Sequence, residues 1–291
     1  MTSPNVPIVD AHAHAFPTSA LPIEGVLAGW KGEASADRLL ADMAQAGVGH
    51  AILVPLGRDP NYVRSLRERH PGRFSALGVQ DGVGLADGWI GNGVRLRWLG
   101  DATDERFDAL PVASLLRQLA ADGVPVSFYG DQHQLELLEK ALRVLPDLTV
   151  MINHLGAPLQ GLNADEHGRP TLDADLPLQT LPVVERCAEF PNVAVAFSGL
   201  YAVSHADYPH MDLRPHAERL LEVLGPTRLL WGSDFPWTAE VPGYATTLEL
   251  VDVHLPGLDP DERAAILGGN AARLFGIDPA QVPSSLREAG S

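Results

Sequence analysis

Eight short apolar runs recur along the chain, and segments with helical periodicity separate most of them. Most runs are almost unbroken stretches of apolar residues, as expected of parallel strands that are covered on their outer face. Strands that alternate with helices predict βαβ units, and eight units predict an α/β fold, a (β/α)8 barrel of the TIM type. The runs span residues 8–14, 50–55, 74–80, 93–99, 124–129, 148–154, 193–199 and 228–233.

The segments between the runs divide into expected helices and long loops. Residues 80–93 are Gly-rich and too short for a full helix, so this connection is the weakest point of the predicted barrel. Long loops at 15–34 and 156–176 are expected to lie over the carboxyl-terminal face. Two short terminal helices within 259–277, packed on the barrel, complete a single expected domain over residues 1–291. The other helices are expected at 36–46, 61–70, 111–121, 132–144, 177–189, 212–224 and 243–254.

The chain is acidic, which limits the partners it can bind. Its formal net charge is −16 over 291 residues, whereas nucleic acids and anionic membranes are bound by basic surfaces. We therefore expect a small-molecule substrate and neither a nucleic acid nor a membrane as partner. An anionic substrate would need arginines at the site to overcome this long-range repulsion. A homo-oligomer is expected only because symmetric dimers are frequent among proteins of this kind.

Cysteine usage and the first residues bear on the cellular compartment. Cys187 is the single cysteine, so the chain forms no internal disulfide, as is typical of reducing compartments. Its neighbours have helical character, which predicts a packed thiol rather than a nucleophile. Residues 1–7 have no basic region and no long apolar segment. We therefore expect no signal peptide, no transmembrane span and a cytoplasmic location.

Residues with metal-binding side chains stand at the carboxyl-terminal ends of three of the apolar runs. His12 and His14 end the first run, His154 ends the sixth, and Asp234 follows the eighth. TIM-type barrels place their active sites at this end of the strands. Three imidazoles and a carboxylate form a ligand set of the zinc type, which predicts a divalent metal and attack of an activated water on a carbonyl. Asp234 also fits a simpler role, as a cap of the helix that begins near Pro236.

Side chains alternate between the two faces of a strand, which predicts the residues that line the barrel mouth. In the fourth strand, Val94 and Leu96 share one face, and Arg95 and Arg97 share the other. An arginine packed under apolar helices without a partner is costly. Both arginines are therefore expected in the mouth, where they either bind substrate or form a structural salt bridge.

The same alternation assigns the first strand and several weaker candidates. It places the side chains of His12 and His14 inside the barrel and those of Ala11 and Ala13 against the helices. Ser127 is expected to point inward as well. Weaker candidates for substrate binding are Tyr129, Ser198 and Trp237. Solvated positions are expected for the loop histidines His133, His205 and His210.

With these residues in place, the chain resembles the amidohydrolase superfamily. The resemblance is to the amidohydrolase-related branch (amidohydrolase family 2) and is nearest to its lactonase-type members. The motifs that carry it are VDAHAH at 9–14, GVRLR at 93–97, NHLGAP at 153–158, WGSDFP at 231–236 and GNAARLFG at 269–276. This branch contains sugar and muconolactone-type lactonases, a pyrone-dicarboxylate lactonase and metal-dependent decarboxylases of aromatic or unsaturated acids. The resemblance therefore implies a barrel enzyme that acts on such small molecules.

Two departures from the superfamily pattern bear on the metal. Binuclear relatives bridge two metals with a carboxylated lysine on a middle strand, and neither Lys31 nor Lys140 has such a position. Many relatives carry a further histidine ligand on the strand after the first lone histidine, and residues 192–199 contain none. The resemblance therefore implies at most one metal, with Zn²⁺ as the first choice. Some members of the branch with this reduced set act without metal.

The leading hypothesis from the sequence is hydrolysis of a lactone that carries a carboxylate. A zinc ion bound by His12, His14 and His154 would polarise the carbonyl, while Asp234 would deprotonate the water. One of the two mouth arginines would hold the carboxylate. Without metal, the same histidines would donate hydrogen bonds to the oxyanion. The alternatives are a metal-dependent non-oxidative decarboxylase of an aromatic or unsaturated acid and, outside enzymes, a barrel that only binds a ligand.

Overall fold

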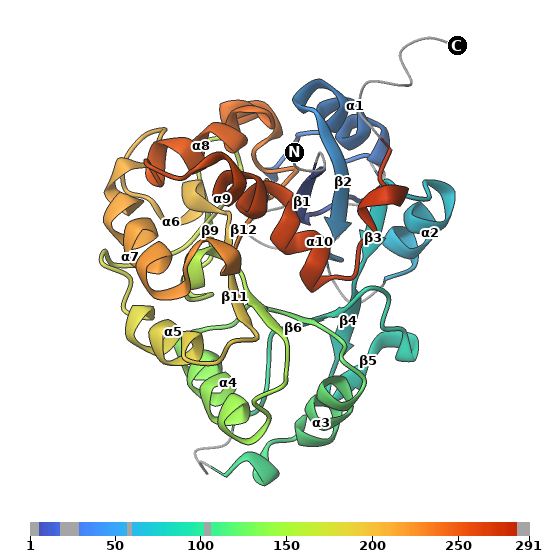
Figure 1. Cartoon of the computed structure of the whole chain (residues 1–291), viewed down its shortest axis with the longest axis vertical. Helices are drawn as coiled ribbons and strands as arrows, with labels where there is room; N and C mark the ends of the chain where they lie inside the picture. The colour runs from blue at the N-terminus through green and yellow to red at the C-terminus, as the bar shows by residue number, and fades with distance from the viewer. Residues whose placement is uncertain (1–5, 18–28, 57–59, 102–105, 284–291) are drawn as a thin grey trace.

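The computed structural model describes residues 6–17, 29–56, 60–101 and 106–283, with strands in the centre and helices around them (Figure 1). The fold is the α/β barrel of the TIM type that the sequence predicts. Each of the eight expected runs overlaps at least one of its strands. In chain order these are β1 (Ile8–Ala13), β2 (Val48–Leu53), β3 (Phe74–Ala76), β4 (Gly78–Asp81), β6 (Val94–Leu96), β7 (Val126–Phe128), β8 (Val150–Ile152), β11 (Val193–Phe197) and β12 (Leu229–Trp231).

The barrel strands are parallel and belong to two hydrogen-bonded sheets, in the orders β1-β2-β3 and β12-β11-β8-β7-β6-β4. The expected run 74–80 is interrupted at Leu77, whose backbone N–H donates to Leu53 in β2. The next N–H, of Gly78, donates to Gly93 on the other side, so this point joins the two sheets. The other edges of the two sheets are β1 and β12. The N–H of Asp234, just after β12, donates to the carbonyl oxygen of His12 in β1 at 2.9 Å.

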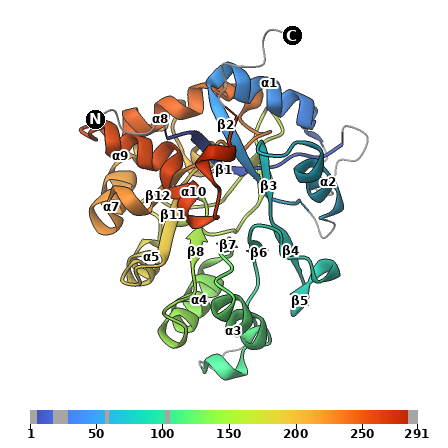
Figure 2. The same cartoon turned by 45° about the vertical axis from the view of Figure 1, so that its right-hand side comes forward.

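Helices cover the outer face of the strands, as the hydrophobic periodicity predicts (Figures 1 and 2). Ser35 caps the first helix by accepting a hydrogen bond from the Arg38 N–H, and Gly47 ends it in the left-handed conformation. Among the described residues, no helix has both the length and the apolar character needed to cross a membrane. The covering helices are α1 (Ala36–Ala46), α2 (Asn61–Arg69), α3 (Ala113–Ala121), α4 (Gln132–Val144), α5 (Leu181–Ala188), α7 (Arg214–Leu224) and α8 (Thr246–His254).

Two connections have their own structure. The connection after β4 contains β5 (Gly84–Leu85) and a 3₁₀ turn, Ala86–Gly88, rather than a full helix, as expected from its composition. The expected loop 156–176 contains a small hairpin, β9 (Asn163–Ala164) and β10 (Pro170–Thr171), that the sequence did not predict. The other expected loop, 15–34, lies partly outside the described residues.

The terminal helices pack against the barrel. They comprise α9 (Pro260–Ala264), a π-helical segment Ala265–Gly269, and α10 (Asn270–Leu274). Gly268 in this segment lies so close to β1 that a Cβ atom would be 2.0 Å from the Pro7 carbonyl oxygen. The terminal helices therefore contact the amino-terminal end of β1, away from the carboxyl-terminal end where the candidate site lies (Figure 2).

The inside of the barrel is filled with small and medium apolar side chains. They come from strands on different sides of the barrel and from the terminal helices, so they can meet only in its interior. Burial of Phe275 among them stabilises the fold by about 1.5–3 kcal/mol. The members of this cluster are Val9, Ala11, Ile52, Val54, Leu77, Met151, Ala194, Ala196, Leu230, Ala271, Ala272 and Phe275.

A bulge in β1 corrects one prediction made from strict alternation. Asp10 and Ala13 pair with Ala51 and Leu53, so three steps along β1 match two steps along β2. Ala13 packs against the helices, as expected, but Ala11 belongs to the interior cluster, so its predicted orientation is wrong. Alternation cannot reveal such an extra residue, because the bulge shifts the side chains that follow it.

Candidate active site

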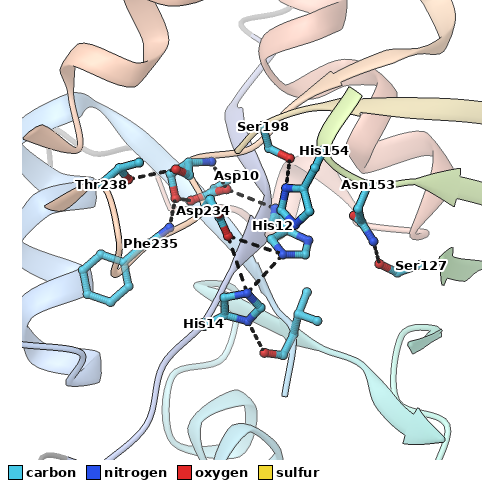
Figure 3. Close-up of polar contacts among 12 residues, drawn as sticks. Asp10, His12, His14, Ser127, Asn153, His154, Ser198, Asp234, Phe235 and Thr238 are labelled. Carbon is cyan, nitrogen blue, oxygen red and sulfur yellow. Dashed lines mark hydrogen bonds and ion pairs between the residues drawn. The ribbon is translucent and has the colours of Figure 1, made fainter. Parts of the chain in front are cut away.

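Three buried side chains direct their polar atoms at one another at the carboxyl-terminal end of the barrel (Figure 3). His12 and His14 come from the end of β1, and Asp234 follows β12. The Nε2 atoms of the two histidines are 3.2 Å apart. Oδ1 of Asp234 lies 3.6 Å from Nε2 of His12 and 3.5 Å from Nε2 of His14. The bulge in β1 and the end of β12 thus bring these three atoms together as a triangle of possible metal ligands.

The hydrogen bonds of His14 determine which of its nitrogens is available. Its Nδ1 lies 2.8 Å from the carbonyl oxygen of Val54. Because a carbonyl can only accept, Nδ1 carries the proton and donates it. In the neutral ring, Nε2 then presents its lone pair to the triangle. Metal-binding histidines are oriented in this way by carbonyl groups behind them.

Burial and charge set the protonation states of the other members. Burial raises the pKa of the Asp234 carboxyl, but the neighbouring histidines, His154 first, outweigh burial and hold this pKa well below its ordinary value. Burial lowers the pKa of His154 to about 4 and lowers the pKa of His12 well below its ordinary value. Near neutral pH the carboxylate is therefore ionised and these two imidazoles are neutral. Ionised carboxylates and neutral imidazoles are the forms that bind metals.

The donor set fits a divalent metal. A tetrahedral zinc ion with bonds of about 2.0–2.2 Å holds its ligand atoms about 3.4 Å apart, close to the 3.2–3.6 Å sides of the triangle. Among the described residues, Oδ1 of Asp234 has no hydrogen-bond partner although it is buried. A buried anionic oxygen without a donor is costly, and a bound cation would remove this cost.

Unusual backbone conformations and a second carboxylate fix these side chains. Asp234 and His154 have φ values of 60° and 51°, which are uncommon for residues with a side chain. Asp10 accepts hydrogen bonds from the N–H and Oγ of Ser233 and from the hydroxyl of Tyr244. Burial raises the pKa of Asp10 to about 6. Asp10 therefore ties β1 to the turn that carries Asp234 and has a structural role.

His154 lies beside the triangle rather than in it. Its ring centroid is 4.7 Å from that of His12 and 4.6 Å from that of Tyr129. Its Nδ1 lies 3.0 Å from Oγ of Ser198, which projects inward from the end of β11. Ser127, also directed inward as predicted, accepts a hydrogen bond from the side chain of Asn153.

Arg95 reaches the mouth, and Arg97 lies at its edge. Arg95 is 7% exposed, its Nη1 donates to the carbonyl oxygen of Pro55 at 2.8 Å, and burial lowers its pKa to about 10. Its Nε has no hydrogen-bond partner among the described residues. Arg97 is exposed, and both arginines line a cavity of about 500 Å³. Within the described part of the chain neither arginine forms an ion pair, which disfavours the structural salt bridge.

A family model described as amidohydrolase matches residues 9–277. The chain belongs to the amidohydrolase family. The match includes every candidate ligand and both mouth arginines.

Two curated relatives of this amidohydrolase are lactone hydrolases. A 4-sulfomuconolactone hydrolase from Rhizobium radiobacter is 33% identical over 118 residues, which cover 39% of this chain and 38% of the relative. An L-fucono-1,5-lactonase from Burkholderia ambifaria is 34% identical over 99 residues, which cover 31% of this chain and 33% of the relative. The chain thus spans well under half the length of these two relatives in the matched segments.

Solved structures share the fold over nearly the whole chain. An amidohydrolase from Burkholderia multivorans with bound zinc has a TM-score of 0.74 at 22% identity, covering 94% of this chain and 100% of that one. A putative 2-pyrone-4,6-dicarboxylic acid hydrolase from Pseudomonas putida has a TM-score of 0.71 at 22% identity, covering 94% and 98%. A 5-carboxyvanillate decarboxylase from Sphingomonas paucimobilis has a TM-score of 0.58 at 15% identity, covering 94% and 100%.

Trp237 belongs to an aromatic cluster at the mouth of the amidohydrolase barrel. It is buried, and its ring centroid lies 5.0 Å from that of Trp30 and 6.4 Å from that of Phe16. Trp237 and Trp30 also line a cavity of about 400 Å³. Its backbone N–H donates to the carbonyl oxygen of Asp234, which places it next to the site, and its role in substrate binding stays a prediction.

Tyr201 is a site residue that the sequence did not single out. Its hydroxyl donates to Oδ2 of Asp234 at 2.8 Å. The available signal was its position three residues beyond Ser198, just after the carboxyl end of a barrel strand. That signal is weak, because a tyrosine near an apolar run is also an ordinary core residue.

One of the three loop histidines departs from its prediction. His133 and His205 are exposed, as expected. His210 is buried, and its Nδ1 lies 3.0 Å from the carbonyl oxygen of Ala206, so the expectation of a solvated position is wrong. The turn that carries it folds onto α8, where Nε2 of His254 donates to the carbonyl oxygen of Pro209.

Proposed function

We propose that this amidohydrolase is a metal-dependent hydrolase that opens a lactone carrying a carboxylate. The observation that carries the proposal is the buried triangle formed by Nε2 of His12, Nε2 of His14 and Oδ1 of Asp234. The sequence similarity to two lactone hydrolases supports the substrate class.

His12, His14 and Asp234 would hold the ion, with His154 beside them. When bound, a zinc ion polarises a carbonyl oxygen and makes a water molecule more acidic. Asp234 stays ionised and accepts a proton from the attacking water. As the bond between the acyl carbon and the ring oxygen breaks, Asp234 passes this proton to the ring oxygen, which leaves as a hydroxyl. The product contains one new carboxyl group and one new hydroxyl group.

The tautomer of His14 bears on the metal-free version of this chemistry. In that version the histidines would donate hydrogen bonds to the developing oxyanion. The proton of neutral His14 is on Nδ1 and is used by the Val54 carbonyl, so Nε2 cannot donate. Only His12 and His154 remain as imidazole donors. This arrangement supports metal binding over hydrogen bonding as the role of His14.

Arg95 is the preferred group for the substrate carboxylate. Its buried Nε lacks a hydrogen-bond partner among the described residues, so an anion at this position would satisfy it. A charge-assisted bond in a buried setting is also stronger than one at the surface. Exposed Arg97 lines the same cavity and would contribute less.

Decarboxylation of an aromatic or unsaturated acid is the second candidate. The fold similarity to a 5-carboxyvanillate decarboxylase favours it. In that reaction the mouth arginines would hold the acid, and a proton would be added to the carbon that loses carbon dioxide.

Proton change separates the two reactions. Carboxylated lactones and aromatic acids are supplied in weak buffer to enzyme that has been stripped of metal and to enzyme reloaded with Zn²⁺. Acidification that needs Zn²⁺ supports metal-dependent lactone opening. Acidification that is equally fast after the metal has been stripped contradicts the metal role. Alkalinisation with an aromatic acid supports decarboxylation instead of hydrolysis.

A further inference from the structure

The two oxygens of the Asp234 carboxylate have different partners. Oδ1 faces Nε2 of His12 and of His14, at 3.6 and 3.5 Å. Oδ2 accepts the hydrogen bond from the hydroxyl of Tyr201, at 2.8 Å. Tyr201 lies in α6 (Leu200–Val203), the short helix that follows β11. The tyrosine therefore contacts the side of the carboxylate that points away from the histidine pair.

This contact determines which way the carboxylate turns. The terminal torsion of an aspartate is broad, so a carboxylate without a second partner can rotate freely about it. A hydroxyl held on Oδ2 restricts that rotation and keeps Oδ1 directed at the histidines. Tyr201 is buried, with only 7% of its surface exposed.

The hairpin of β9 and β10 holds Tyr201 from the other side. The guanidinium carbon of Arg169 lies 4.8 Å from the centre of the Tyr201 ring. Arg169 is fixed in turn by Asp165, at 2.7 Å, and by the carbonyl oxygen of Val241, at 2.6 Å. The N–H of Leu172 also donates to a carbonyl of α6. A continuous set of contacts therefore runs from the hairpin through Tyr201 to Asp234.

We propose that Tyr201 is a positioning residue that orients Asp234 toward the metal, and that Arg169 holds Tyr201 in place. This inference rests on the metal site of the proposed function. The simpler interpretation is that Tyr201 only fills the aromatic cluster with Trp30 and Trp237. The two interpretations differ in what the hydroxyl does, because phenylalanine would fill the same space.

The test is zinc affinity, measured on the whole protein by competition with a coloured chelator. Tyr201→Phe keeps the ring and removes only the hydroxyl. Loss of a group that orients a metal ligand typically weakens metal binding by about 10–100-fold, and we expect a loss in this range. Ser75→Ala is the control, because it also removes a buried hydroxyl from a polar contact, that with Nε2 of His50, far from the site. It should lower the melting temperature and change zinc affinity by less than about threefold.

Arg169→Leu provides a second variant if Tyr201→Phe does not fold. It leaves the Tyr201 hydroxyl in place and removes the cation from its ring. A cation–π contact is modest in free energy, so we expect zinc affinity to fall in the same direction, by about three- to tenfold.

The outcomes are distinguishable. Unchanged zinc affinity in folded Tyr201→Phe overturns the inference and leaves the metal site standing. An equal loss in Ser75→Ala also overturns it, because the loss of any buried hydroxyl would then weaken zinc binding. Failure of the unaltered protein to bind Zn²⁺ overturns the metal site itself and the inference with it.

Discussion

A Cβ atom at position 199 would lie 2.5 Å from Nδ1 of His154, so only glycine lets the Gly199 backbone pass beside this imidazole. The φ of Gly199 is +67°, which also favours glycine. Ser198, one residue earlier, lies 3.0 Å from the same nitrogen. The end of β11 therefore fixes the ring of His154 by a polar contact and by close backbone packing.

Gly199→Ala should displace His154 and lower kcat by at least about tenfold, as misplacement of a site residue commonly does. Gly123→Ala is the matched control, because Gly123 has a φ of +64° but no atom within 4 Å of its Cβ position. It should cost about 1–2 kcal/mol of stability from backbone strain alone and leave kcat unchanged. Kinetics and thermal unfolding of both variants provide the comparison. Equal kcat losses would show that the contact with His154 is unimportant.

Asp234→Asn should remove the proton acceptor while keeping the fold. We expect kcat to fall by about 10²–10⁴-fold, with a circular dichroism melting curve close to that of the unaltered protein. Asp10→Asn should instead lower stability, because Asp10 accepts three hydrogen bonds from Ser233 and Tyr244. An amide there places donors against donors and should cost about 1–3 kcal/mol of stability. Near-normal kcat in Asp234→Asn would exclude Asp234 as the base.

Arg95→Gln should affect carboxylated substrates selectively. Loss of a charge-assisted hydrogen bond costs about 1.5–3 kcal/mol, so kcat/KM for a carboxylated lactone should fall by about 10–150-fold. The same variant should retain kcat/KM for a neutral lactone of similar size. Arg97→Gln, at the exposed edge of the cavity, should show a smaller loss. Parallel losses on charged and neutral substrates would assign Arg95 a structural role.

His50, far from the site in the second strand, should make stability depend on pH. It is buried, with Nδ1 2.8 Å from the carbonyl oxygen of Gly72 and Nε2 2.9 Å from Oγ of Ser75. Burial lowers its pKa from 6.5 to about 4. Between these values the unfolded chain binds more protons than the folded one, so the free energy of unfolding falls as pH drops through this window.

The expected loss due to His50 is about 3 kcal/mol at most. Urea unfolding at pH 7 and at pH 4.5 measures it. His50→Gln removes the titrating group and should lose less stability between the two pH values than the unaltered protein does. An identical loss in both would show that other groups cause the acid sensitivity.

The strands and the ligand residues were predictable because both leave local signals. Buried parallel strands are apolar throughout, and the candidate ligands His12, His14 and Asp234 stand where those runs end, with His154 beside them. The alternation of side chains along the strand also predicted that Arg95 points into the barrel mouth, because a cation packed under apolar helices would have no partner. These predictions needed only the period of the strand and the cost of burying a charge.

The rest of the site depends on contacts between distant segments. The bulge that breaks the alternation between Ala11 and Ala13 follows from the pairing of β1 with β2, which no single stretch of sequence specifies. Tyr201 contacts Asp234, which lies 33 residues later in the chain. Arg169 contacts Tyr201 from a hairpin that the sequence predicted to be a loop. His210 is buried by a turn that folds onto α8. Such positions are set by tertiary packing, so local composition did not reveal them.

Anomalous diffraction at the zinc absorption edge, on crystals of the zinc-loaded protein, locates a bound zinc ion independently of catalysis. We expect one peak at the barrel mouth, within bonding distance of Nε2 of His12, Nε2 of His14 and the carboxylate of Asp234. No peak there, or a peak held by other residues, would exclude this metal site.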